Sequence, residues 1–104
     1  MLAASDLVFA LVDRSADRLA GFARVLTDGA YLALVLDVVV AVEWRGQGLG
    51  RTLMDALVAH PRLAGVKSLE LVCQPEMMPF YRRWGFTDDI GPSTLMRLNR
   101  IPLP

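Results

Sequence analysis

The chain has 104 residues, of which 54% are hydrophobic, and this length and composition predict one soluble domain with its own core. Eleven Lys and Arg residues balance eleven Asp and Glu residues, and the basic residues are spread along the chain, which argues against nucleic acid or an acidic membrane surface as a partner. One cysteine, Cys73, and one histidine, His60, exclude an intramolecular disulfide and supply no cluster of metal ligands.

The composition also indicates a compartment. The N-terminus lacks the basic region of a signal peptide, and the longest nearly uncharged run, Ala30 to Val42, is well short of the ~20 residues that a membrane-spanning helix needs. With a single cysteine, the chain suits a reducing environment, so we expect a cytoplasmic protein that has no membrane partner.

The first elements predicted along the chain are strands. Leu7 to Val12 and Leu19 to Thr27 are apolar runs separated by the polar stretch DRSADR, which predicts two antiparallel strands. Asp28 and Gly29 predict a tight hairpin turn. The almost continuous apolar run that begins near Tyr31 then predicts a third, central strand with both faces covered.

The hydrophobic period changes after this strand and predicts a helix. One helical stripe is formed by Leu49, Thr52, Leu53, Ala56 and Leu57. The helix should end near His60, before Pro61, with His60 in its last turn beside the negative end of the dipole. After the loop PRLAG, the segment VKSLELVC predicts another strand, so the order strand, helix, strand indicates a parallel, right-handed βαβ unit.

The last third of the chain predicts one more helix. Gln74 and Pro75 end the preceding strand, and Met77 to Trp84 predicts a short helix that ends at Gly85. Phe86 and the apolar alternation of Thr94 to Leu98 would allow a closing strand or hairpin.

A glycine-rich basic turn, Arg45 to Arg51 (RGQGLGR), joins the third strand to the first helix. Its three glycines permit several N–H groups to point into one concavity, and the first helical turn adds unpaired N–H groups and the positive end of its dipole. Arg45 and Arg51 flank this concavity and offer charge-assisted bonds to phosphate oxygens. The turn therefore predicts a phosphate or diphosphate site, with tight packing as the alternative explanation of the glycines.

Two familiar phosphate motifs do not fit this turn. A nucleotide P-loop needs Lys and then Ser or Thr after its last glycine, whereas Gly50 is followed by Arg51 and Thr52. The dinucleotide fingerprint G-x-G-x-x-G differs from the G-x-G-x-G spacing found here.

The spacing resembles the acyl-CoA-binding motif of the GNAT superfamily of N-acetyltransferases, because Arg45-x-x-Gly48-x-Gly50 follows VVVAVEW and precedes an amphipathic helix. Further along, PFYRRWGF is similar to the F-Y-x-x-x-G-F signature of that family, and FALVD and LAGFARVLTD are similar to its antiparallel strands. The resemblance implies an α/β (α+β) fold, with a mixed, largely antiparallel sheet, a central parallel βαβ unit and flanking helices.

The resemblance also implies a cosubstrate, acetyl-CoA, and no metal. The backbone of Val38, Val39 and Val40 would hold the pantetheine arm and polarise the thioester carbonyl. Arg45 lies at the start of the motif, and the backbone N–H groups that would bind the diphosphate belong to Gly46, Gln47, Gly48, Leu49, Gly50 and Arg51.

Two residues are candidates for catalysis of acetyl transfer to a primary amine. Tyr81 matches the tyrosine that acts in many family members as general acid for the leaving thiolate; the alternative is an aromatic residue of the core. Asp37 is the ionisable residue within the third strand, and it would deprotonate the amine, orient a water that does so, or bond to neighbouring backbone. Nothing in the sequence identifies the amine, which would belong to a small molecule or a peptide.

The chain differs from the family at its beginning, where the usual first strand and helices have no counterpart before FALVD. We therefore expect residues 1–104 to form a single, N-terminally shortened domain, and an exposed strand edge predicts a homodimer. Two functions are compatible with these features. The first is an N-acetyltransferase that works by direct attack on the thioester, and the second is a CoA-binding module without turnover, either regulatory or a truncated remnant.

Overall fold

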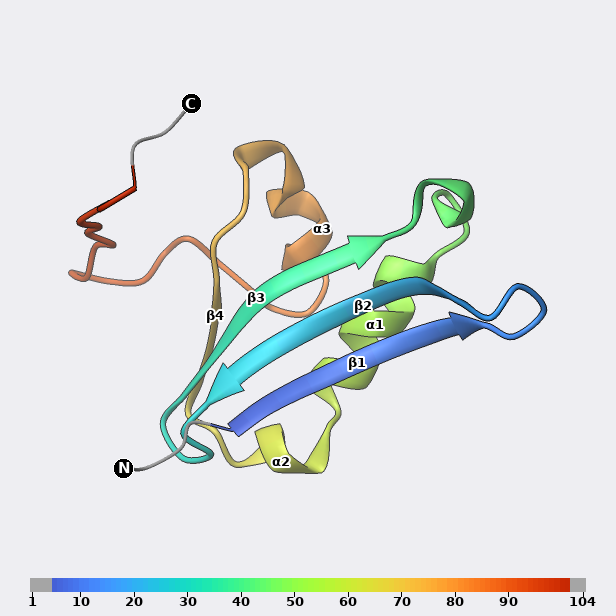
Figure 1. Cartoon of the computed structure of the whole chain (residues 1–104). Helices are drawn as coiled ribbons and strands as arrows, with labels where there is room; N and C mark the ends of the chain where they lie inside the picture. Colours follow the sequence, from blue (N-terminus) through green and yellow to red (C-terminus); the bar gives the residue numbers. More distant parts are fainter. Residues whose placement is uncertain (1–4, 102–104) are drawn as a thin grey trace.

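The computed structural model describes residues 5–101 and shows a curved sheet with helices packed on it (Figure 1). The strands are β1 (Ser5–Asp13), β2 (Arg18–Thr27), β3 (Leu32–Val40) and β4 (Ser68–Leu71). The helices are α1 (Leu49–Val58), α2 (Pro61–Ala64) and α3 (Met78–Arg82), with single turns of 3-10 helix at Val42–Trp44 (η1) and Pro75–Met77 (η2).

The sheet has the order β1-β2-β3-β4. β1 pairs with β2 and β2 with β3 in antiparallel fashion, whereas β3 and β4 are parallel, with Leu32 opposite Ser68 and Val35 opposite Leu71. This confirms the predicted mixed sheet and the βαβ unit. β3 is an internal strand as expected, but β4 is an edge strand within the described residues, so the βαβ unit is less central than the sequence suggested.

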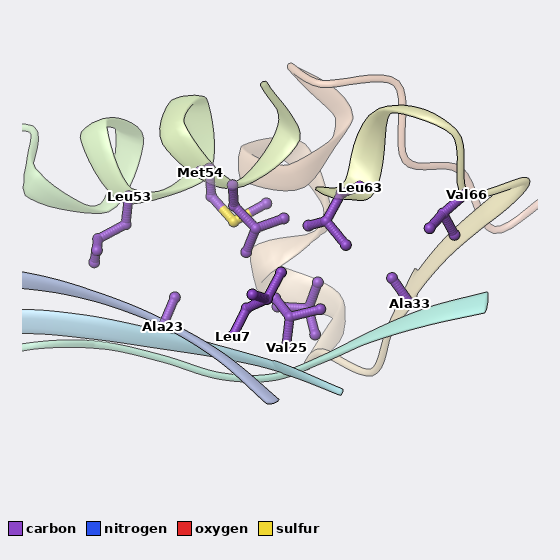
Figure 2. Close-up of a cluster of buried hydrophobic side chains, with 10 residues drawn as sticks. Leu7, Ala23, Val25, Ala33, Leu53, Met54, Leu63 and Val66 are labelled. Atoms are coloured by element: carbon purple, nitrogen blue, oxygen red, sulfur yellow. The ribbon is translucent and has the colours of Figure 1, made fainter. Parts of the chain in front are cut away.

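The core lies between α1, α2 and one face of the sheet (Figure 2). Leu53, Met54 and Leu57 of α1 are at most 1% exposed and meet Ala23 and Val25 from the sheet. The buried stripe of α1 is rotated from the prediction, because Met54 is buried while Thr52 and Ala56 are exposed. No helix in the part of the chain that the structure describes is long and apolar enough to cross a membrane.

A β-bulge in β3 decides which side chains of that strand face the helices. Arg24 is opposite Asp37 and Val25 is opposite Val35, so Leu36 is an extra residue in the strand. Ala33 and Val35 face the core before the bulge, and Val38 and Val40 do so after it. Without the extra residue, Asp37 would point into the apolar core, where an unpaired carboxylate is costly.

The opposite face of the sheet is open, contrary to the prediction of a strand covered on both faces. Leu36 and Val39 of β3 are 40% and 43% exposed, and Val8 and Val12 of β1 are 64% and 54% exposed. The prediction from hydrophobicity was wrong for this face, because apolar residues are often exposed on protein surfaces.

Two of the predicted turns have a different form in the structure. The hairpin between β2 and β3 is confirmed, but its loop covers residues 28–31, and the Asp28 carboxylate accepts the N–H groups of Ala30, Tyr31 and Leu32 at 2.9, 2.8 and 3.2 Å. These N–H donors lower the pKa of Asp28.

α1 ends at Val58, close to the predicted stop near His60 and before Pro61, but the segment that follows differs from the prediction. The expected loop PRLAG contains α2, and His60 caps that helix by accepting the N–H of Arg62 on Nδ1 at 3.1 Å, so it is not in the last turn of α1. α3 ends at Arg82, earlier than the predicted stop at Gly85, but Gly85 does have the expected left-handed conformation, with a φ of 93°, and donates its N–H to the Arg82 carbonyl at 3.0 Å. The optional closing strand at Thr94 to Leu98 is absent, because these residues have no regular structure.

Candidate functional site

The glycine-rich turn lies at the C-terminal end of β3 and leads directly into α1. Gly46 and Gly48 have φ values of 81° and 82°, a left-handed conformation that a side chain disfavours, and Gly48 is the N-terminal cap of α1. No side chain caps this end, and the first intrahelical bond shown is from the Thr52 N–H to the Gly48 carbonyl at 3.1 Å. The N–H groups at the start of α1 are therefore available to an anion.

A hollow of about 260 Å³ lies on this turn. Its walls come from the end of β3, the turn, the first helical residues and α3 with the residue after it: Val40, Trp44, Arg45, Gly46, Gly48, Leu49, Gly50, Arg51, Phe80 and Arg83. We call this hollow and its backbone N–H groups the cradle. Of the residues predicted to bind the cosubstrate, the cradle brings together all but Gln47, Val38 and Val39.

The donor set of the cradle fits a diphosphate. Free backbone N–H groups and a helix N-terminus border one space, three arginines line it, namely Arg45, Arg51 and Arg83, and no acidic residue does. Arg45 is partly engaged, because its Nε donates to the Val40 carbonyl at 3.1 Å. That bond ties the guanidinium to the end of β3 and leaves its Nη groups without a partner in residues 5–101.

Sequence reasoning missed the part of the cradle that α3 and the residue after it provide. A Cβ placed on Gly50 would lie 3.3 Å from Cζ of Phe80, so this aromatic ring rests directly on the first turn of α1. The guanidinium of Arg83 lies 5.8 Å from the centre of the same ring. Arg83, the second arginine of PFYRRWGF, was the one sign in the sequence of a further basic residue at the cradle. Its position at the turn depends on the packing of α3 on α1.

β3 and β4 separate beyond the bulge. Their ladder ends at Val35 and Leu71, so Val38, Val39 and Val40 have no strand partner on the β4 side within the described residues. Open backbone at this position is what the predicted main-chain role of these valines requires. Val40 reaches the cradle, whereas Val39 is exposed on the open face and Val38 packs against the core.

Tyr81 is half-buried on α3. Its ring makes edge-to-face contacts with Phe80 at 5.0 Å and with Phe86 at 6.2 Å between ring centres. Burial raises the pKa of Tyr81 above its ordinary value of 10.0, and the charge of an ionised Cys73 thiol raises it further. The phenol therefore keeps its proton at neutral pH, as a general acid must.

A second hollow, of about 1000 Å³, lies between β4, α3 and the segment after Phe86, and both Tyr81 and Cys73 line it. Cys73 is half-buried and free. Tyr81 thus lines this second hollow and not the cradle, whereas its neighbour Phe80 lines the cradle.

Asp37 is exposed on the open face of the sheet, opposite Arg24, and lines neither hollow. The structure therefore does not bring Asp37 and Tyr81 into one cavity. Among residues 5–101 no group of three His, Cys, Asp or Glu side chains is placed to hold a metal ion.

Comparisons with known proteins agree with this geometry. Residues 4–88 match the model of a family described as an acetyltransferase (GNAT) domain. The chain is 45% identical over 75 residues to serotonin N-acetyltransferase 2 of Oryza sativa subsp. japonica, an alignment that covers 72% of this chain and 38% of that protein. It is 34% identical over 87 residues to an uncharacterised N-acetyltransferase, ycf52, of Porphyra purpurea, with 82% of this chain and 50% of that protein covered.

Solved structures share the fold. An acetyltransferase of the GNAT family from Xanthomonas campestris pv. campestris superposes with a TM-score of 0.79 at 39% identity, over 90% of this chain and 64% of that one. The chain thus spans half or less of the length of these two curated relatives and about two thirds of the Xanthomonas chain.

Proposed function

This chain belongs to the GNAT family of acetyltransferases, and from that premise we propose that it transfers an acetyl group from acetyl-CoA to a primary amine of a small molecule or peptide. The observation that carries the proposal is the cradle. Three arginines and an uncapped helix N-terminus line a space there that no acidic residue lines, which suits the diphosphate of coenzyme A.

The proposed reaction is direct attack of the amine nitrogen on the thioester carbon. A C–N bond forms, the C–S bond breaks, the amine loses one proton and the departing thiolate receives one. Backbone N–H groups of β3 on its unpaired side are suited to the negative charge that develops on the carbonyl oxygen. Tyr81, which holds its proton at neutral pH, would supply the proton to the sulfur.

The proposed base that accepts the amine proton is Asp37. Asp37 is exposed on the open face, where it could receive a proton directly or through water. Because Asp37 lines neither hollow, this role requires the acceptor amine to approach from the open face of the sheet.

A thiol-release assay with acetyl-CoA and a panel of primary amines tests the proposed function. The panel includes serotonin, because a relative is named for it, together with amino sugars and lysine-containing peptides. We expect steady release of CoA with at least one amine and a matching acetylated product by mass spectrometry. Binding of acetyl-CoA without turnover on any amine would instead favour a CoA-binding module, and absence of binding would contradict both functions.

We further propose that two copies of the chain pair through the free edge of β4. Within residues 5–101, β4 pairs only with β3, and residues 94–98 make no backbone hydrogen bond. In the proposed dimer, residues 94–98 of one copy pair with β4 of the other. Placing Arg97 of one copy opposite Glu70 of the other sets Met96 and Leu98 opposite Leu69 and Leu71, whether the two strands run parallel or antiparallel. Such a register joins opposite charges on one face and apolar side chains on the other.

Reversing one charge should weaken this dimer. In Arg97→Glu, two carboxylates would face each other across the ladder, so sedimentation velocity should show a shift from dimer to monomer. The double variant Glu70→Arg with Arg97→Glu restores opposite charges and should restore the dimer. A wild-type protein that sediments as a monomer at every concentration would rule the pairing out.

A further inference from the structure

The short helix α3 is joined to α1 by a single hydrogen bond. Nε1–H of Trp84, two residues after the end of α3, donates to Oδ1 of Asp55 on α1 at 2.8 Å. In the part of the chain that the structure describes, no other hydrogen bond or ion pair connects residues 78–86 to α1. The acceptor is a carboxylate, so the bond belongs to the stronger, charge-assisted kind.

This bond lies between the two parts of the proposed site. Asp55 is on α1, four residues after Arg51 at the end of the cradle turn. Trp84 is three residues after Tyr81, and its backbone N–H donates to the Tyr81 carbonyl at 3.1 Å. The rings of Phe80 and Trp84 pack with their centres 5.0 Å apart, and Phe80 in turn rests on Gly50. A displacement of Trp84 would therefore move Tyr81 relative to the cradle.

We infer that Trp84 and Asp55 are positioning residues that hold α3 against α1 and so fix Tyr81 relative to the cradle. This inference rests on the proposed acetyl transfer, in which the tyrosine must reach the leaving sulfur while the cradle holds the diphosphate. α3 has only five residues, and Phe80, Tyr81 and Trp84 pack against the core through apolar contacts, which are non-directional. A directional bond to a helix that is itself anchored in the core supplies the missing constraint.

The first variant is Trp84→Phe, which removes the indole N–H and keeps an aromatic ring against Phe80. The steady-state kcat should fall by about tenfold or more, because a misplacement of ~1 Å at a reacting group can cost on the order of 100-fold. The Kd for CoA should change much less than kcat, because only Phe80 and Arg83 of the cradle lining belong to α3 and the residue after it. A kcat equal to wild type, or a loss that appears only in CoA affinity, would overturn the inference.

Substitutions at Asp55 distinguish positioning from general destabilisation. Asp55→Asn keeps an oxygen acceptor and should retain most of the wild-type kcat, whereas Asp55→Leu removes the acceptor and should behave like Trp84→Phe. The matched control is Asp13→Ala, which removes the bond from Ser15 Oγ to Asp13 Oδ1 at 2.7 Å, a carboxylate hydrogen bond at the turn between β1 and β2 whose residues line neither hollow. This control should leave kcat unchanged.

A double-variant comparison shows whether the effect passes through Tyr81. In a Tyr81→Phe background, Trp84→Phe should lower kcat no further, since residues that act through one group are not additive. The same loss in both backgrounds would mean that Trp84 acts elsewhere, and the inference would be wrong.

A readout without turnover separates this inference from the proposed function. Hydrogen–deuterium exchange of a peptide that covers residues 78–86 should be faster in Trp84→Phe and Asp55→Leu, and at the wild-type rate in Asp55→Asn. If no amine is acetylated, the proposed function fails while the exchange rates still report whether the bond holds α3. Unchanged exchange in Trp84→Phe would overturn the inference even in an active enzyme.

Discussion

Replacing Tyr81 by phenylalanine is expected to lower kcat by about 10²- to 10⁴-fold, the range for loss of a positioned general acid. The substitution removes only the hydroxyl group. The ring contacts with Phe80 and Phe86 remain, so α3 should keep its place. Since Tyr81 does not line the cradle, the Kd for CoA should be unaffected. Parallel measurements of kcat and of CoA binding by calorimetry test this expectation.

The pH dependence of the activity tests the role of the Tyr81 hydroxyl independently. Burial raises the pKa of Tyr81 above 10.0, so its acid form persists through neutral and weakly alkaline pH. Loss of activity through ionisation of Tyr81 should therefore occur only as the pH rises above 10.0, and it should be absent in Tyr81→Phe. Wild-type kcat in Tyr81→Phe would show that the tyrosine is an aromatic residue of the core and that the thiolate obtains its proton elsewhere.

The cradle was predictable from the sequence to a large extent, because its chemistry is local. Glycine spacing and the change from a strand to a helical period are properties of neighbouring residues, and Gly46 and Gly48 do have positive φ values. The participation of Phe80 and Arg83 was not predictable in this way. It depends on how α3 packs on α1, which connects residues about 30 positions apart and has no local pattern.

The orientation of β3 shows a different limit. The run LALVLDVVV has no alternation that marks where an extra residue lies, so the sequence predicts a strand without predicting which valines face the core. Asp37 could have indicated the position of the extra residue. A carboxylate must avoid the apolar core, so the alternation of side chains between the two faces of the strand has to shift by one residue near Asp37. The bulge at Leu36 makes this change and places Asp37 on the open face.

A methyl group at Gly48 should weaken CoA binding by at least about tenfold, or about 1.4 kcal/mol. Gly48 has a φ of 82° and lines the cradle at the N-terminus of α1. In Gly48→Ala, the new Cβ meets no protein atom within 4 Å, so it would occupy space that the ligand needs. It would also favour a change of backbone angle that turns the N–H groups away from a shared anion.

Gly29→Ala is the matched control for Gly48→Ala. Gly29 has a similar φ of 79°, and a Cβ there also meets nothing within 4 Å, but it lies in the loop between β2 and β3 and does not line the cradle. Both variants should lose a comparable ~1–2 kcal/mol of stability from the left-handed conformation, and only Gly48→Ala should lose CoA affinity. Equal Kd values for CoA in the two variants would mean that the diphosphate does not bind at this turn, because the strain is shared and only the position differs.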